Sequence, residues 1–204
     1  MERRERERDP GHGTFVGQLS DAYNVLLRSS SIDWLSSGAC VPPFLPEDRE
    51  VGDVDLIAVS YTRTGTEWSA AWEERLGTLP GRSVIVGVDD AVRESDGGRS
   101  DVVETNESPD DLTGIGITLS EYLSSWGCEG GDLVVCFDSL TALLQYVSLQ
   151  RAYRFLHVLT GRAAAVGARS HYHLDPGAHD DRTVATLTSL FDAVVDESGA
   201  VRTR

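Results

Sequence analysis

Short apolar runs alternate along this chain with segments in which apolar residues recur at helical spacing. The runs have the length and the β-branched content of buried strands, whereas the segments between them have apolar residues three or four positions apart. The predicted strands are 24–27, 54–60, 83–88, 133–137, 168–174 and 193–196, and the predicted helices are 67–76, 117–126, 140–147, 151–166 and 180–190. Such alternation indicates a mostly parallel central sheet with helices on both faces. The sequence therefore predicts an α/β fold in the form of a three-layer sandwich.

The length of 204 residues fits a single domain that can bury a core without disulfides. Residues 1–13 are rich in arginine and glutamate and have no apolar segment, which predicts a disordered tail rather than a signal peptide. Residues 14–204 are predicted to form one domain, with an acidic loop at about 89–111 that contains a short edge strand at 102–103. No apolar run approaches the roughly 20 residues that span a bilayer, so the expected location is the cytoplasm.

The chain contains no lysine: its 18 basic residues are all arginine, against 33 acidic residues and a formal net charge of -15. This charge argues against binding to nucleic acid phosphates or to anionic membranes, because both attract positive surfaces. An acidic surface of this kind is expected in a high-salt cytoplasm, where screening weakens self-repulsion. The missing lysine also excludes the Gly-x-x-x-x-Gly-Lys-Ser/Thr phosphate loop and Schiff-base chemistry through lysine.

The apolar run 133–137 closes on Asp138 and Ser139. In phosphate-loop NTPases, an aspartate at the end of a central parallel strand holds Mg²⁺ directly or through water. Ligands of open α/β sheets bind outside the carboxyl ends of the strands, where Asp138 is expected to lie. An alternative role for Asp138 is to cap the helix that begins at Leu140. The pattern by itself leaves both roles open.

Four segments of the second half carry a resemblance to a known family: 132–144, 151–159, 173–180 and 183–195. They resemble the C-terminal half of a RecA/KaiC-type ATPase domain, and most closely a divergent haloarchaeal branch of that superfamily. The resemblance covers about Leu112 to Asp196, and the first half matches in outline. It implies a RecA/KaiC-like fold in which Asp138 occupies the magnesium-binding Walker B position and Ser139 follows it as in the family.

The sequence departs from the family where the phosphate loop and the catalytic carboxylates belong. The strand 24–27 aligns with the strand before the phosphate loop, but the residues after it contain no glycine pair and no lysine. Where the second strand of KaiC-like enzymes ends in acidic residues that activate water, this chain has Arg63. The resemblance therefore implies a degenerate Walker A loop and no general base. The residues that could replace the phosphate grip by binding an anion are Ser29, Ser30, Ser31, Arg28 and Arg63.

Histidines and an aspartate concentrate near the end of the strand predicted at 168–174. On a strand, His171, His173 and Asp175 would project from one face, and His179 follows after a turn. Imidazoles with a carboxylate can ligate zinc or another transition metal. The alternative is that His173 and Asp175 form the polar end of the strand, and that Asp180 caps the next helix.

These observations favour a regulatory or protein-interaction domain that has lost ATPase chemistry. Two alternatives stay open, namely an ATPase with a remodelled, lysine-free phosphate loop and a metal-dependent enzyme that uses His171, His173 and His179. ATP with Mg²⁺ is expected to bind weakly at most, and no other cofactor is indicated. The expected partner is another protein or a second copy of this chain, because the superfamily often assembles side by side.

Overall fold

The computed structural model describes residues 19, 21–30, 49–88 and 102–204. In this part of the chain, eight strands form one sheet in the order β4-β3-β2-β5-β6-β1-β7-β8. Neighbouring strands are parallel except for the terminal hairpin of β7 and β8. The strands are β1 (Asn24–Arg28), β2 (Val54–Ser60), β3 (Arg82–Gly87), β4 (Val102–Asn106), β5 (Asp132–Phe137), β6 (Arg169–Leu174), β7 (Ala193–Val195) and β8 (Val201–Thr203).

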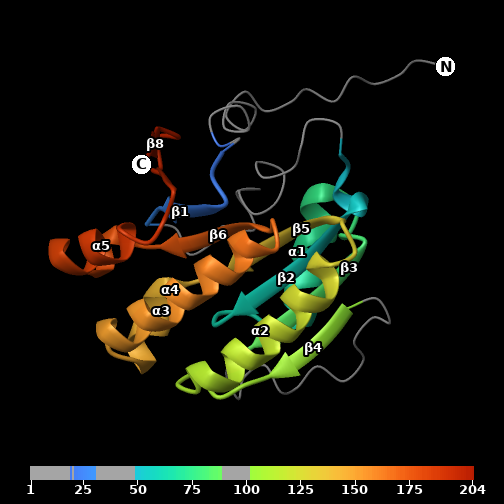
Figure 1. Ribbon diagram of the computed structural model, residues 1–204, viewed down its shortest axis with the longest axis horizontal. Helices are drawn as coiled ribbons and strands as arrows, with labels where there is room; N and C mark the ends of the chain where they lie inside the picture. Colours follow the sequence, from blue (N-terminus) through green and yellow to red (C-terminus); the bar gives the residue numbers. More distant parts are fainter. Residues whose placement is uncertain (1–18, 20, 31–48, 89–101) are drawn as a thin grey trace.

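Helices cover both faces of this sheet, as predicted for a three-layer α/β sandwich (Figure 1). The α-helices are α1 (Gly65–Leu76), α2 (Leu112–Gly127), α3 (Leu140–Tyr146), α4 (Leu149–Ala165) and α5 (Asp181–Thr188), and the 3-10 helices are η3 (Val51–Asp53) and η5 (Pro176–Ala178). Helix α1 packs on one face, whereas α2, α3, α4 and α5 pack on the other. Among the helices of the described residues, none combines the length and the apolarity needed to cross a membrane.

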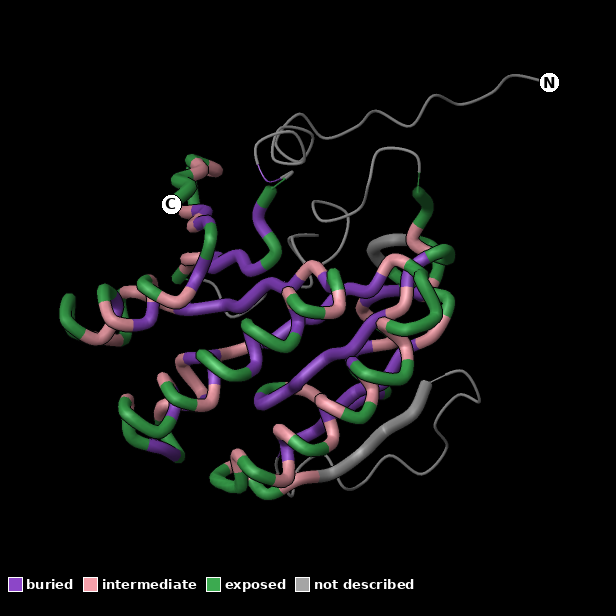
Figure 2. Tube along the Cα trace, viewed as in Figure 1, coloured by how far each residue is buried: buried purple, intermediate pink, exposed green. Residues whose placement is uncertain are grey.

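Side chains of each central strand alternate between two cores, which makes the strands the most buried part of the molecule (Figure 2). Ile57 and Tyr172 lie in the larger core with helices α2 to α5. Cys136 lies on the opposite face, in the smaller core with Trp68 and Trp72 of α1. Burial on both faces explains why these strands read as nearly continuous apolar runs in the sequence.

Helix α2 begins five residues before its predicted start at Ile117, so that boundary was wrong. The observed N-cap is Asp111, whose carboxylate accepts hydrogen bonds from the backbone N–H groups of Thr113 and Gly114. The start of α2 contains Gly114 and Gly116, and glycine has a low helix propensity, so the sequence there did not predict a helix. Another prediction is confirmed: the edge strand at 102–103 is part of β4.

Some predicted features lie outside the described residues. They are the disordered tail at 1–13, Ser31, and most of the acidic loop at 89–111. The last part of that loop is described: it begins with β4 and ends at Asp111, the N-cap of α2.

Candidate functional site

The carboxyl ends of β1, β2, β5 and β6 meet at one edge of the sheet, because these strands are parallel and adjacent. Arg28 at the end of β1 is paired with Leu174 at the end of β6. Phe137, the residue before Asp138, is paired with Val59 of β2 and Tyr172 of β6. The predicted residues near 28–30, 60–63 and 138 therefore come together at the edge where open α/β sheets bind ligands.

Asp138 is buried at this edge, with 7% of its surface exposed, and its carboxylate is surrounded by donors from the end of β2. The Tyr61 backbone N–H donates to Oδ1 at 2.9 Å. The hydroxyls of Ser60 and Thr62 lie 2.7 Å from Oδ2, and the Thr62 N–H donates to the same oxygen at 3.3 Å. Burial raises the pKa of Asp138, and these hydrogen bonds oppose the rise. The carboxylate thus joins the ends of β5 and β2.

Ser60 is the centre of this hydrogen-bond network, which we call the Asp138 clamp (Ser60, Tyr61, Thr62, Trp68 and Asp138). Its hydroxyl oxygen accepts hydrogen bonds from the Arg63 backbone N–H at 3.1 Å and from Trp68 Nε1 at 3.2 Å. A hydroxyl has one proton to donate, and the short, charge-assisted bond to Asp138 is stronger than the alternative to the Arg63 carbonyl at 2.9 Å. The loop after β2 is therefore fixed by both Asp138 and α1.

The helix that follows β5 is capped by Ser139 and not by Asp138. Ser139 Oγ accepts a hydrogen bond from the Ala142 backbone N–H at 2.9 Å at the start of α3. The alternative role suggested for Asp138 thus belongs to its neighbour. Asp138 is left for the contacts with Ser60 at the end of β2 and with Tyr61 and Thr62 after it, which lie 76 to 78 residues away in the chain.

The residues after β1 hydrogen-bond to groups of the protein itself. The Ser29 N–H donates to the Leu174 carbonyl at 3.1 Å, which extends the β1–β6 ladder. The Ser30 N–H and the Ser30 hydroxyl both donate to Glu197 Oε1, the hydroxyl at 2.6 Å. These bonds, the backbone N–H first, lower the pKa of Glu197. The Ser30 donors, which were predicted to bind an anion, thus form hydrogen bonds with the carboxylate of Glu197.

Arg28 and Arg63 are both half-buried at the same edge. Arg28 is the last residue of β1, and its Nε is buried without a hydrogen-bond partner among the residues that the structure describes. Arg63 lies between β2 and α1, where its backbone contacts the Ser60 hydroxyl. The structure brings both arginines to the edge that carries Asp138.

The four residues predicted as metal ligands divide into two places. His171 and His173 lie together inside the sheet layer, next to Cys136 of β5, and the potential ligand atoms of these three residues all lie within 4.8 Å of one another. Asp175 lies beyond the last residue of β6, and its carboxylate accepts the Gly177 N–H at 2.8 Å at the start of η5. His179 Nε2 lies 3.1 Å from Thr141 Oγ1, which also accepts the Asp175 N–H at 3.0 Å.

Neither Asp175 nor His179 belongs to the three-residue cluster found among the described residues. The strand ends at Leu174, so the alternation that aligns His171 with His173 does not extend to Asp175. Burial lowers the pKa of His171 to about 3 and that of His173 well below its usual value, so both imidazoles are neutral at pH 7. The cap predicted for the next helix is confirmed, since Asp180 accepts the Thr183 N–H at 2.7 Å.

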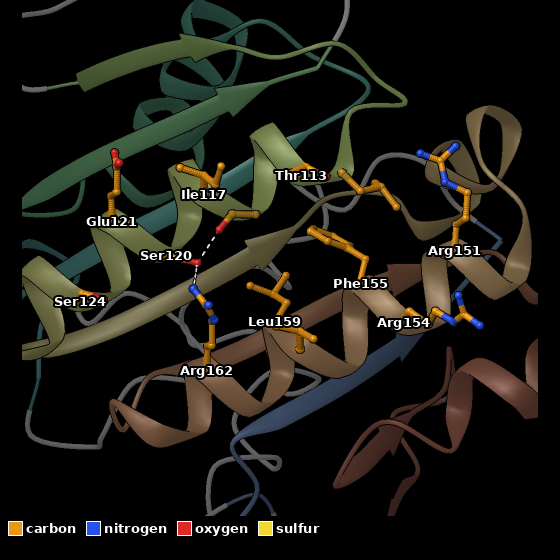
Figure 3. A pocket seen from close by; sticks show the side chains of 13 residues that line it. Thr113, Ile117, Ser120, Glu121, Ser124, Arg151, Arg154, Phe155, Leu159 and Arg162 are labelled. Carbon is orange, nitrogen blue, oxygen red and sulfur yellow. Dashed lines mark hydrogen bonds between the residues drawn. The ribbon is translucent and has the colours of Figure 1, made fainter.

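A groove of about 760 Å³ lies between α2 and α4, a feature that the sequence analysis missed. Figure 3 shows Phe155 and Leu159 of α4 directed toward α2, and Ile117 of α2 also lines the groove. Ile117 and Val158 are 56% and 55% exposed, which is unusual for large apolar side chains. The helical spacing of apolar residues predicted that Phe155 and Leu159 lie on the core-facing side of their helix. Spacing alone does not show which apolar residues of that side line a surface groove.

Three arginines line the same groove on α4, against one acidic residue, Glu121, on α2. The Arg162 guanidinium reaches across and donates to the Ser120 hydroxyl (Figure 3). Arg151 donates a hydrogen bond to the Asp110 carbonyl at 2.9 Å. Arg154, which lies between Arg151 and Arg162 in the sequence, also lines the groove. An apolar floor with a net positive rim is therefore present on a protein whose net charge is -15.

Comparison with known proteins identified one matching family and several similar folds. A family model described as "Family of unknown function (DUF7504)" matches residues 22–197. A search of curated proteins found no match to this sequence.

Among solved structures, the chain is similar to uncharacterized protein PH0321 from Pyrococcus horikoshii, in complex with an unknown peptide. The identity is 12%, the TM-score is 0.51, and the match covers 92% of this chain and 89% of that one. It is also similar to the flagellar accessory protein FlaH from Methanocaldococcus jannaschii, with 12% identity, a TM-score of 0.51, and coverage of 86% and 70%. These neighbours have the RecA-like α/β fold, which confirms the fold that the resemblance implied.

Proposed function

Since this chain belongs to the DUF7504 family and has a RecA-like fold, we propose that it is a non-catalytic RecA/KaiC-like domain that binds another protein. The observation that carries the proposal is the Asp138 clamp, in which the carboxylate at the Walker B position is used inside the protein. The domain keeps the sheet of an ATPase and uses its edge for stability. Its role is regulatory, in signalling or in control of a partner.

The Asp138 clamp competes directly with magnesium binding. A Walker B aspartate must present a carboxylate oxygen to Mg²⁺ or to its water shell. Here Oδ2 receives three donors and Oδ1 receives one. A metal ion could reach the carboxylate only after several of these bonds had broken, and the Ser60 hydroxyl and the Tyr61 N–H would then be left in a buried place.

The phosphate side of the crevice supports the same proposal. The Ser30 donors face the carboxylate of Glu197, whose negative charge would repel a nucleotide phosphate. The chain has no lysine to reach a β- or γ-phosphate. Arg28 and Arg63 are the cations that could replace it at this edge, and neither supplies the backbone cradle of a glycine-rich loop.

Titration of the protein with ATP and Mg²⁺ is expected to give no saturable heat up to millimolar nucleotide, equivalent to a binding free energy weaker than about -4 kcal/mol. The measurement is isothermal titration calorimetry at low and at molar salt, with a phosphate-release assay on the same samples. The matched variant is Glu197→Gln, which removes the competing negative charge. Micromolar binding by the native protein that disappears in Asp138→Asn would instead establish the ATPase with a remodelled loop.

The α2–α4 groove is the surface that we propose for the partner. Its floor has exposed apolar side chains, Ile117 and Val158 among them, and its rim carries Arg151, Arg154 and Arg162. An amphipathic helix fits such a groove by burying one apolar face. Acidic residues beside that face would complement the arginines, so the occupant we propose is an acidic amphipathic helix of a partner protein. The neighbour PH0321 was solved in complex with an unknown peptide.

A synthetic helical peptide with a leucine stripe and glutamate flanks is expected to bind at least about tenfold more tightly than the same peptide with lysine flanks. Fluorescence anisotropy at 0.1 M salt measures both affinities, and rising salt is expected to reduce the difference. Arg154→Glu and Val158→Asp are expected to abolish the preference, whereas Arg202→Glu on the exposed hairpin is the matched control. Equal affinity for both peptides would contradict this occupant. Sedimentation that shows a dimer, lost in Val158→Asp, would assign the groove to a second copy of the chain.

The acidic, lysine-free composition supports a high-salt cytoplasm as the setting, because screening there removes most of the self-repulsion of the -15 net charge. In that setting the apolar floor would contribute more to partner binding than the arginine rim. This proposal predicts that apolar substitutions weaken binding at any salt concentration, whereas charge substitutions act mainly at low salt.

A further inference from the structure

Two central strands bring together three side chains that can ligate a metal ion. Cys136 on β5 and His171 on β6 are partners in the parallel register, and His173 follows two residues later on the same face of β6. This face is opposite to the one that carries α2 to α5, and it is separate from the α2–α4 groove. The exposed fraction is 0% for Cys136 and His171 and 1% for His173.

The distances within this cluster are close to those of ligands around a single ion. Cys136 Sγ lies 3.9 Å from His173 Nε2, and the potential ligand atoms of all three residues lie within 4.8 Å of one another. A sulfur ligand at about 2.3 Å and a nitrogen ligand at about 2.0 Å from a tetrahedral ion lie about 3.5 Å apart. The imidazole rings are 5.2 Å apart and inclined by 81°, so they can approach one ion from different directions. The Cys136–His173 pair at 3.9 Å is close to this spacing, and the widest pair, at up to 4.8 Å, would have to approach by about 1 Å through rotation of the side chains.

The ligand types restrict the metal. One sulfur and two imidazole nitrogens suit zinc and copper, whereas magnesium and calcium require oxygen ligands. Full burial restricts the net charge, because an uncompensated charge inside the protein is costly. A thiolate with Cu⁺ gives a neutral centre with three ligands, whereas Zn²⁺ leaves one positive charge and takes a fourth ligand.

We propose that Cys136, His171 and His173 bind one thiophilic metal ion, Cu⁺ or Zn²⁺, which links β5 to β6 inside the sheet. On binding, the Cys136 thiol gives up its proton to solvent and the thiolate coordinates the ion, with no change of oxidation state. The ion would stabilise the fold and would take no part in a reaction, since the three ligands are fully buried and no substrate can reach them. This centre does not depend on the nucleotide edge or on the partner groove.

The test uses the full chain, prepared without metal and under reducing conditions, and titrated separately with Zn²⁺ and with Cu⁺. The expected result is one ion per chain by elemental analysis for one of the two metals, and a rise of several degrees in the unfolding temperature. Titration with Co²⁺ is expected to give a near-ultraviolet thiolate-to-metal absorption band, which reports directly on the sulfur ligand of the unmutated protein.

Cys136→Ser and His173→Gln are expected to lose the ion and the temperature rise, whereas Cys128→Ser keeps both. Cys128 is the matched control because it is an exposed cysteine outside the cluster. If the variants fail to fold, the cobalt spectrum of the native protein still decides the question. Absence of binding by all three ions, or a Co²⁺ complex without the sulfur band, would overturn the proposal.

Discussion

Asp138→Ala is expected to lower the free energy of unfolding by about 3 kcal/mol, because it removes at once the acceptor of four hydrogen bonds, two of them buried. The N–H of Tyr61 and the N–H and hydroxyl of Thr62 lose their partner, while the Ser60 hydroxyl can turn to the Arg63 carbonyl. Urea denaturation measures the change. If Asp138 were instead a catalytic or metal-binding residue without such partners, its replacement would raise the free energy of unfolding, because a buried charge without a ligand is costly.

Two variants make this experiment specific. Asp138→Asn keeps the shape but turns one acceptor into a donor, so it is expected to cost about 2 kcal/mol. Asp132→Ala at the other end of β5 is the control for loss of an aspartate. Its ion pair with Arg49 at 2.8 Å is partly exposed, and such pairs contribute about 0–1 kcal/mol. An Asp138→Ala protein as stable as Asp132→Ala would contradict the clamp and reopen the magnesium role.

Trp68→Ala is expected to lower the free energy of unfolding by about 4 kcal/mol, the usual cost of removing a fully buried large aromatic side chain. Trp68 is 1% exposed, packs against Trp72 with ring centroids 5.7 Å apart, and donates a hydrogen bond to Ser60. Its removal opens a cavity under α1 and also frees one anchor of the Asp138 clamp. Thermal and urea unfolding measure the loss.

Trp68→Phe separates the two contributions of this side chain. The variant keeps most of the apolar contact and loses the indole N–H, so the expected cost of the hydrogen bond is about 1 kcal/mol beyond the change in packing. In the double variant with Ser60→Ala, the hydrogen-bond part is expected to vanish, since the acceptor is gone as well. Additive losses in that cycle would show that Trp68 acts through packing alone.

Much of the fold could be predicted from the chain because its strands are buried on both faces and its helices have regular apolar spacing. The strands around Val54–Ser60 and Asp132–Phe137 were placed to within one residue. The start of α2 could not be predicted from apolar spacing, because Gly114 and Gly116 near its start have low helix propensity. The helix is instead started by the side chain of its N-cap, Asp111. The hydrogen-bond partners of side chains at the carboxyl edge of the sheet, such as Asp138, could not be predicted from the sequence, because they come from other strands.

Local pattern was sufficient for the parallel α/β sheet, for the Asp138 position at the end of a central strand, and for the absence of a lysine-based phosphate grip. Periodicity and composition are properties of neighbouring residues, so they are visible in the chain itself. The hydrogen bonds of the Asp138 carboxylate come from donors 76 to 78 residues away in the chain. The contact of His171 and His173 with Cys136 depends on the register between β5 and β6. Only the packed sheet decides such pairings, because strand order and register set which distant side chains share one buried place.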